Sequence, residues 1–307
     1  MSLTLLAVQA LNGLQLGLLL FLIAAGLTLV FGVMDFINLA HGAQYITGAY
    51  LAVFFYGHTG HFGAALGLAL LAALALGLVL EALVYRRLYH RPHLDQVLAT
   101  FGVILILTEG ARALFGPSPL SLPRPEILSG AVPLMDGLNY PVWRLAIIAA
   151  GLAAALGLWL LVRRTRLGMQ LRAGADDAEM IGALGVDVAR LFRAVFGLGA
   201  MLAGFAGAMA APVLAVEPDM GDGVLILAFV VIVIGGVGSI RGALAAALLV
   251  GLVDTLGRSL STDVARLFLS PSAANDAGPA VASMLVYVVM AAVLFARPQG
   301  LFPVKAQ

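Results

Sequence analysis

Eight long apolar runs constrain the fold of this chain more than any other feature. Most are close to the roughly 20 residues that an α-helix needs to cross the hydrocarbon of a bilayer. A chain that is 62% hydrophobic and 11% charged, with a mean hydropathy of +1.05, cannot close a water-soluble surface. The sequence therefore predicts a polytopic membrane protein. The runs cover residues 11–33, 63–84, 94–115, 142–162, 191–216, 224–239, 243–257 and 280–296.

The runs favour helices, because the strands of a membrane β-barrel alternate apolar and polar residues over about ten positions. We expect an all-α transmembrane bundle of about eight or nine spans, forming a single domain over residues 1–307. Residues 40–56 are short and polar, so they form either a polar span or a broken, re-entrant one. In the first and fifth runs glycines recur among leucines, which predicts closely packed helices.

A second interruption is expected where glycines break an apolar run, because a helix can stop short there and turn back. These glycines are Gly235, Gly236 and Gly238. Broken helices are where repeat-built transporters place their pathways. We therefore count the three glycines among the candidate pathway residues.

Arginine and lysine gather in alternate loops, and short loops rich in these residues stay on the cytoplasmic side. Alternation then places residues 116–141, 217–223 and 258–279 outside and the C-terminus inside, while the side of the N-terminus stays open. Prolines throughout 116–141 predict an extended connector, which either only links two spans or docks a soluble partner. The expected cytoplasmic residues are Arg86, Arg87, Arg91, Arg163, Arg164, Arg166, Arg172, Arg190, Arg193, Arg241, Arg297 and Lys305.

The cytoplasmic loop 163–193 is the most distinctive polar segment. Asp176 is expected to cap a short helix over residues 176–184, Glu179 completes a capping box, and Gly185 is a suitable left-handed stop. An apolar face on such a helix either fills a groove in a partner protein or lies on the membrane. That face is formed by Met180, Ile181 and Leu184, with Arg172 and Arg190 on its flanks.

Polar residues inside the apolar runs are the next signal, because unpaired charge in hydrocarbon is costly and persists where it is paired or lines an aqueous path. Asp35, Asn38, His41 and Gln44 recur every three residues and would share one face of a helix. They either line a pathway or form a capped turn in which His41 satisfies a backbone carbonyl. Asn12 completes the candidate pathway set.

Two further charged pairs have helical spacing. Glu109 stands three residues before Arg112, and Asp254 four residues before Arg258. Each pair can form on one face of a helix. Pairing near a helix end therefore explains both.

Several functions are disfavoured. The chain has no cysteine, which excludes disulfides and thiolate metal sites. We find no metal-binding His/Glu spacing and no nucleophile beside a base, so an intramembrane enzyme, a metal centre and a cofactor are not expected. The only lysine is Lys305, so no P-loop exists through which this chain would bind ATP. No nucleic-acid partner is expected.

Several motifs together resemble the permease subunits of bacterial ABC importers, and within them the LivH-type branched-chain amino acid permeases. Glu179 and Gly185 stand six apart, as in the importers' EAA loop, although Met180 and Ile181 replace its two alanines. Four other stretches have the look of the branched-chain subgroup: residues 172–177 with 185–187, 26–33 with 37–42, 235–243, and 297–302. The matches span nearly the whole chain.

The resemblance implies a subunit of the bacterial inner membrane that pairs with a second homologous permease, two cytoplasmic ABC ATPases and a periplasmic substrate-binding protein. The substrate expected first is a branched-chain or related amino acid, followed by amides, urea or other small carboxylates. The residues expected to couple to the ATPases are Arg172, Asp176, Asp177, Glu179, Met180, Ile181, Leu184 and Gly185.

The alternative is an ion-coupled secondary transporter of small polar solutes. It requires a buried carboxylate or histidine that takes up and releases an ion. Asp35, His41, Glu109 and Asp254 are the candidates. Uptake that an uncoupler abolishes, and that ATP depletion leaves intact, would favour it.

Overall fold

The computed structural model describes residues 3–135 and 138–303; Lys305 lies outside these residues. Seven helices of the described part are long and apolar enough to cross a membrane. They are α1 (Leu3–Met34), α3 (Phe62–Leu83), α4 (His93–Phe115), α5 (Val142–Arg164), α8 (Val188–Ala210), α10 (Ile240–Ala265) and α11 (Pro271–Ala296). The shorter elements are α2 (His41–Thr59), α6 (Arg166–Asp176), α7 (Ala178–Ala183), α9 (Met220–Gly235) and the 3₁₀ turns η1 (Tyr85–Arg87) and η2 (Glu126–Leu128).

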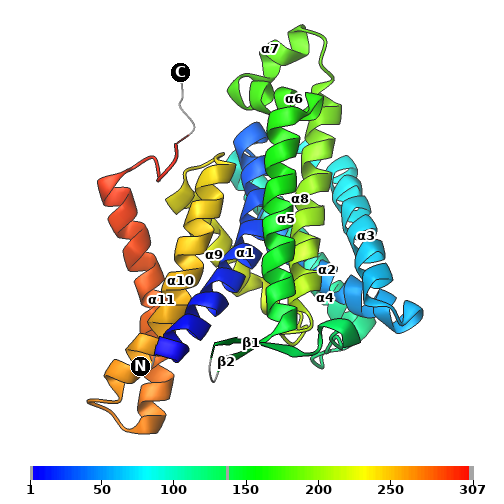
Figure 1. Ribbon diagram of the computed structural model, residues 1–307. Coiled ribbons are helices and arrows are strands. Elements are labelled where there is room, and N and C mark those ends of the chain that lie inside the picture. Colours follow the sequence, from blue (N-terminus) through cyan, green and yellow to red (C-terminus); the bar gives the residue numbers. More distant parts are fainter. Residues whose placement is uncertain (1–2, 136–137, 304–307) are drawn as a thin grey trace.

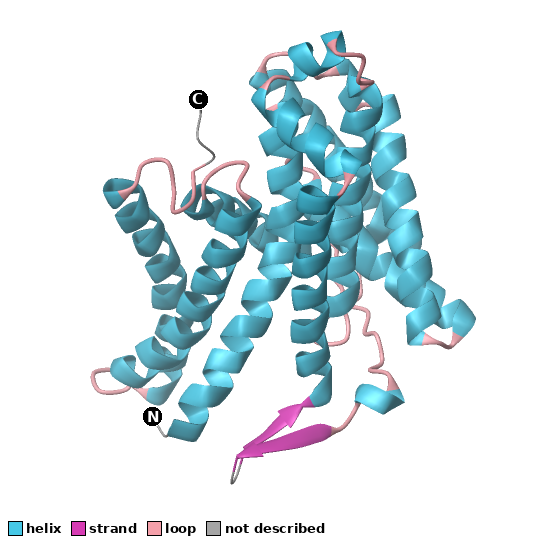
Figure 2. Ribbon diagram, turned by 45° about the horizontal axis from the view of Figure 1, so that its top comes forward, coloured by secondary structure: helices cyan, strands magenta, loops and turns pink. Residues whose placement is uncertain are grey.

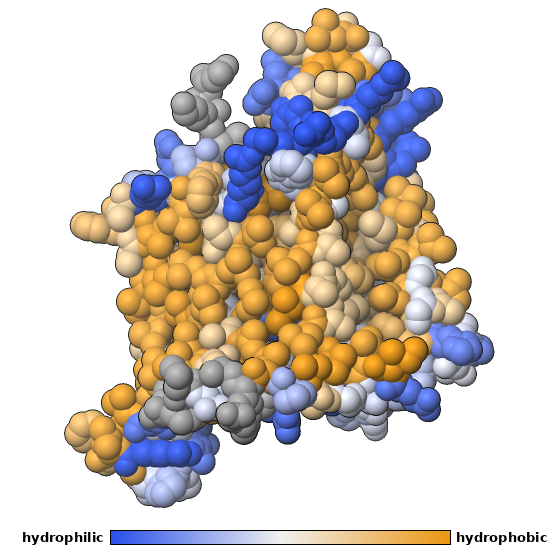
Figure 3. All heavy atoms as spheres, in the orientation of Figure 1, coloured by the Kyte–Doolittle hydropathy of each residue, from blue (hydrophilic) through white to orange (hydrophobic). Residues whose placement is uncertain are grey.

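The prediction of an all-α polytopic bundle is confirmed (Figures 1 and 2). With α2 and α9, which pack inside the bundle, the long helices reach the expected number of about eight or nine. Figure 3 shows a broad apolar band between two more hydrophilic ends. The band is the surface that a bilayer's hydrocarbon requires.

Helix α1 is the centre of the bundle and packs against α5, α8, α9 and α10. It runs from the end that carries the β-hairpin to the end that carries α6 and α7 (Figure 1). The arginine-rich loop lies at the second end, which the positive-inside rule makes cytoplasmic. On this expectation, the first described turn of α1 lies at the outer end.

The predicted close packing of glycine-rich helices is confirmed at two contacts. A Cβ added to Gly17 of α1 would come within 2.7 Å of the carbonyl oxygen of Ala247 in α10. A Cβ on Gly48 of α2 would collide with the backbone of Gly204 in α8. Since hydrocarbon offers no hydrophobic drive between helices, such backbone contact supplies much of their attraction.

The outer loop 116–141 is extended, as its prolines predict. It contains η2 and a two-stranded antiparallel hairpin of β1 (Ala131–Met135) and β2 (Leu138–Pro141), with Val132 opposite Tyr140. The backbone of Leu120 also pairs with that of Val216 in another outer segment.

The third predicted outer loop, 258–279, is wrong in its extent. Helix α10 continues to Ala265 and α11 already begins at Pro271, where Ser270 accepts a hydrogen bond from the amide of Ala273. Only residues 266–270 connect the two helices. Hydropathy marks the part of a helix that lies in hydrocarbon, whereas backbone hydrogen bonds continue the helix into the polar zone.

Candidate functional site

The arginine-rich loop 163–193 contains two helices instead of the single short helix that we expected. Helix α6 ends at Asp176, and α7 begins two residues later. The N-cap of α7 is Asp177, not Asp176, because the Asp177 carboxylate accepts hydrogen bonds from the amides of Glu179 and Met180 at 3.0 and 2.8 Å. The expected capping box does not form, because Glu179 is the second residue of α7 and not the third, and the amide of Asp177 already donates to the carbonyl oxygen of Ala173 in α6.

Gly185 ends α7 as predicted, with φ 89 in the left-handed region. The amides of Gly185 and Val186 donate to the carbonyl oxygens of Gly182 and Ile181 at 3.0 and 3.1 Å. This pair of bonds is a Schellman motif, which satisfies the last carbonyls of a helix. Capped at both ends, the six residues of α7 have a fixed shape at the tip of the cytoplasmic end (Figure 1).

The apolar residues of α7 do not share one exposed face. Ile181 is only 6% exposed, whereas Met180 is 61% and Leu184 78% exposed. The Ile181 side chain lies against Gly174 of α6. It therefore anchors α7, and the surface offered to a partner is formed by Met180 and Leu184.

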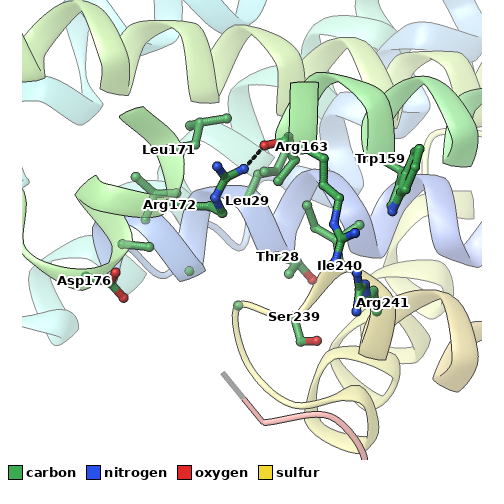
Figure 4. A pocket seen from close by; sticks show the side chains of 15 residues that line it. Thr28, Leu29, Trp159, Arg163, Leu171, Arg172, Asp176, Ser239, Ile240 and Arg241 are labelled. Atoms are coloured by element: carbon green, nitrogen blue, oxygen red, sulfur yellow. Dashed lines mark hydrogen bonds between the residues drawn. The ribbon is translucent and has the colours of Figure 1, made fainter. Parts of the chain in front are cut away.

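Two adjoining cavities lie between α6 and the cytoplasmic end of α1. One, of ≈ 380 Å³, reaches from α1 and α5 to the start of α10 (Figure 4). The other, of ≈ 750 Å³, extends toward Tyr89 and Phe192. Asp176 and Gly238 line both, and Asp35 lines the second. Arg172 lines the first, where it donates a hydrogen bond to the carbonyl oxygen of Val162.

Residues 40–56, expected as either a polar span or a broken one, lie almost wholly in the unbroken helix α2, and the first interruption precedes that helix, between α1 and α2. Residues 35–38 are not helical, so Asp35 and Asn38 do not share a helical face with His41 and Gln44, and that expectation was wrong. Asp35 adopts φ 49 and its amide donates to Phe31, which ends α1. Its carboxylate lies 3.6 Å from His93 Nε2.

The buried polar residues of this segment lie inside the packing and line none of the cavities described above. His41 is fully buried, and its Nε2 lies 3.1 Å from the carbonyl oxygen of Ile23, the contact that the capped-turn alternative expects. Asn38 and Gln44 are also buried, and the amide group of Asn38 has no hydrogen-bond partner among the described residues. The backbone is held instead by Gln96 of α4, whose Oε1 accepts from the Ile37 amide at 3.1 Å.

The second interruption turns back as predicted, with α9 ending at Gly235 and α10 starting at Ile240. Gly236 and Gly238 have φ values of 97 and 80, which L side chains rarely adopt. A Cβ on Gly32 of α1 would come within 2.6 Å of Gly238 Cα, so the second interruption packs against the last turns of α1.

Asn12 lies apart from the other candidate pathway residues, at the outer end of α1. Its Oδ1 accepts hydrogen bonds from Tyr140 Oη at 3.0 Å and Arg144 Nη1 at 2.6 Å. These bonds tie α1 to β2 and α5. The structure thus brings Asp35 and Gly238 to the cavities, and places Asn12 in an outer contact.

Sequence reasoning explains Glu81, one turn before Arg86 and Arg87, by a location at the cytoplasmic interface, and it missed the buried charged cluster that Glu81 forms. Glu81 of α3 is fully buried and accepts hydrogen bonds from Arg86 at 3.0 and 3.2 Å and from Tyr89 Oη at 2.8 Å. Arg193 of α8 lies 3.6 Å away. Burial, together with the Glu81 carboxylate, raises the pKa of Tyr89, so its hydroxyl remains a donor. The available signal was the position of Arg86 and Arg87, which follow Glu81 closely in the sequence.

Comparison with known proteins identifies the family. The profile described as "Branched-chain amino acid transport system / permease component" matches residues 9–294. The chain belongs to this family. The permease is 30% identical to the high-affinity branched-chain amino acid transport system permease protein LivH of Escherichia coli K12, over 95% of this chain and 96% of the relative. It is 29% identical to BraD of Pseudomonas aeruginosa, over 83% and 87% of the two chains.

A shorter match reaches a different transport system. The permease is 33% identical to the fructose import permease protein FrcC of Rhizobium meliloti over 34% of this chain and 31% of that relative. No solved structure matches the permease. Within its described residues, no group of three His, Cys, Asp or Glu side chains stands ready to hold a metal ion.

Proposed function

We propose that the chain is the transmembrane subunit of an ABC importer for branched-chain or related amino acids, acting as one permease domain in the bacterial inner membrane. It forms half of the translocation pathway, and a second homologous permease forms the other half. Two cytoplasmic ATPases supply the energy, and a periplasmic binding protein delivers the substrate. The near full-length similarity to LivH and BraD supports the transport class and the substrate class.

One structural observation carries the coupling part of the proposal. Helix α7 is a rigid element at the cytoplasmic tip, and it exposes Met180 and Leu184 where a soluble surface would carry polar residues. Exposed apolar side chains on a capped helix suit the groove of a partner protein. The anchor Ile181 and the contact of α6 with α1 give motion of α7 a path into the bundle.

Alternating access requires two states of the bundle that differ little in free energy, each favoured by a different nucleotide state of the ATPase pair. The cavities between α6 and α1 leave room for such movement. In this mechanism α7 transmits the motion of the ATPases to the bundle. Asp177, Glu179 and Gly185 fix the shape of α7, while Met180 and Leu184 contact the ATPase. Arg172 and Asp176, both on α6, line the cavity and connect α7 with it.

The test combines co-purification with uptake. Leu184→Asp in the tagged full chain is expected to lower the recovery of ATPase subunits about tenfold or more, because a buried apolar contact at an interface centre contributes about 2 kcal/mol. Glu179→Lys and Gly185→Asp are expected to weaken assembly or coupled uptake and leave membrane insertion intact. Phe268→Asp, at an equally exposed apolar side chain of the outer end, is the matched control and keeps the ATPases.

Full ATPase recovery and full leucine uptake in all three α7 variants would contradict the coupling role.

A test of the energy source distinguishes an ABC importer from an ion-coupled transporter. Uptake that survives an uncoupler and stops when ATP is depleted supports the importer, and the reverse supports ion coupling. Uptake of another solute class with no leucine uptake would overturn the substrate assignment alone.

A further inference from the structure

The cavity of ≈ 380 Å³ at the cytoplasmic end has the composition of an anion site. Its volume lies in the range of about 300–1,000 Å³ that is typical of small-ligand sites. Its cationic side chains come from three helices: Arg163 of α5, Arg172 of α6 and Arg241 of α10. Figure 4 shows Arg163 and Arg241 reaching into the same part of the cavity, with Asp176 on the far side beyond Arg172.

The protein offsets the positive charge of this cavity only in part, because the described residues that line it include three arginines and one carboxylate, Asp176. Arg172 is engaged by the carbonyl oxygen of Val162. Arg163 lies over the ring of Trp159 at 5.7 Å, which is a favourable contact that leaves its charge in place. Within residues 3–135 and 138–303, neither Arg163 nor Arg241 forms an ion pair. Two unpaired guanidinium groups in one cavity favour an anionic occupant.

A buried hydroxyl provides an independent sign of a ligand. Thr28 of α1 is 1% exposed, lines the cavity, and its Oγ1 has no hydrogen-bond partner among the described residues. Figure 4 shows this oxygen on the side of Ser239 and Arg241. An unpaired buried hydroxyl costs about 1–3 kcal/mol, so an acceptor from outside the chain would offset a real penalty.

Helix α10 begins at the same place. Ser239 caps it by accepting from the Gly242 amide at 3.1 Å, and Ser239, Ile240 and Arg241 all line the cavity. The start of a helix carries partial positive charge and favours anions. The hydroxyl of Thr28, the start of α10 and the two arginines therefore converge on one volume.

The surroundings select a lipid. Trp159, a residue type enriched at the membrane–water interface, stands one helical turn before Arg163. Leu152 and Leu156 continue the same face of α5 toward the outer end, and both are exposed. A zwitterionic amino acid carries no net charge and would leave the arginines unbalanced, whereas a phosphodiester balances one of them and its acyl chain covers the leucines.

We propose that this cavity binds the phosphate of an anionic phospholipid of the cytoplasmic leaflet. Arg163 and Arg241 pair with the phosphate, Thr28 donates its hydroxyl hydrogen to a phosphate or ester oxygen, and one acyl chain lies along Leu152 and Leu156. Basic pockets between helices on the cytoplasmic side suit such headgroups. The site requires neither an ATPase nor a transported solute, so it stands independently of the proposed function.

The test measures the thermal stability of the full chain, purified with whatever subunits accompany it, while phosphatidylglycerol is titrated into the detergent. Phosphatidylglycerol is expected to raise the melting temperature, and phosphatidylcholine of the same chain length is not. The double variant Arg163→Gln/Arg241→Gln weakens the apparent affinity about 30-fold, as two interfacial arginines would. Thr28→Val, an isosteric change, weakens it about fivefold through one lost hydrogen bond. Arg164→Gln, which removes a neighbouring arginine outside the cavity lining, leaves it unchanged.

Four results would overturn the proposal. The first is an unchanged phosphatidylglycerol response in the double variant, and the second is an equal loss in Arg164→Gln, which would indicate general surface attraction. The third is a melting shift produced as well by inorganic phosphate or leucine as by the lipid. The fourth is a response that vanishes when a second permease subunit is present, since that subunit would then cover the face of α5.

Discussion

The two interruptions of the helical bundle line one cavity, through Asp35 and Gly238, and they are built in opposite ways. The interruption between α9 and α10 is a tight turn whose backbone groups are largely satisfied. The amide of Ser239 donates to Gly236, and the amides of Leu301 and Phe302 donate to Ile234 and Gly235 at the end of α9. The motif at residues 297–302 thus closes a helix end.

The interruption between α1 and α2 has no such closure of its own. The Ile37 amide depends on Gln96 of another helix, and the amide group of Asn38 is buried without a partner among the described residues. A buried polar group that lacks a partner is costly. The comparison teaches that one interruption is determined by backbone geometry, while the other keeps polar groups that the fold alone does not need.

The largest effect is expected from breaking the glycine turn. Gly236→Val places a branched side chain at φ 97, and its Cβ would meet the carbonyl oxygens of Gln299 and Phe302 at 3.0 and 3.1 Å. We expect a loss of about 3 kcal/mol or more in the free energy of unfolding, measured by denaturant unfolding in detergent. Gly102→Ala, on a helix with open space around it, is the control and changes stability by less than about 1 kcal/mol. A fully stable Gly236→Val would show that the turn adapts.

An intermediate loss of stability is expected when Gln96, which supports the interruption between α1 and α2, is replaced. Gln96→Leu leaves the Ile37 amide and the carbonyl oxygen of Arg91, which Gln96 Nε2 contacts at 3.2 Å, without these partners. The carbonyl oxygen of Leu88 loses its contact with Gln96 Nε2 at 3.4 Å but still accepts from the Arg91 amide. The expected loss is about 2 kcal/mol, with faster hydrogen exchange at Ile37. Gln170→Leu, at an exposed glutamine, should change neither the stability nor the hydrogen exchange at Ile37. Unaltered exchange at Ile37 in the Gln96 variant would mean that this segment supports itself.

The smallest effect on stability, and the sharpest on function, is expected at Asn38. Because its amide group has no partner among the described residues, Asn38→Leu removes a buried polar group and should leave stability unchanged or raise it by about 1 kcal/mol. Solute uptake should fall if the segment contacts the solute during transport. Gln15→Leu, at another buried amide outside the interruption, serves as the control for uptake. Normal uptake in Asn38→Leu would remove Asn38 from the pathway set.

Local chemistry explains which predictions succeeded. The length of the apolar runs determined the long helices, and the glycines at 235–238 and 185 determined where α9 and α7 end. Both features depend on neighbouring residues alone. The cap of α7 was misplaced by one residue, since Asp176 and Asp177 are both good caps and only the contact of Ala173 with the Asp177 amide decides between them. Ile181 was assigned to an exposed face because the sequence does not show that α6 lies beneath it.

The sequence by itself determined that the chain is a multi-pass membrane protein, and it located the glycine turn between α9 and α10 and the end of α7 at Gly185. Those properties follow from hydropathy, charge and backbone conformation, each read within a few residues. The tertiary structure alone decided that Glu81 is buried against arginines of two helices, that Gln96 supports a break 59 residues away, and that Thr28, Arg163 and Arg241 line one cavity. Such groupings depend on how distant helices pack, and packing in lipid is set by surface shape and backbone approach, which hydropathy does not encode.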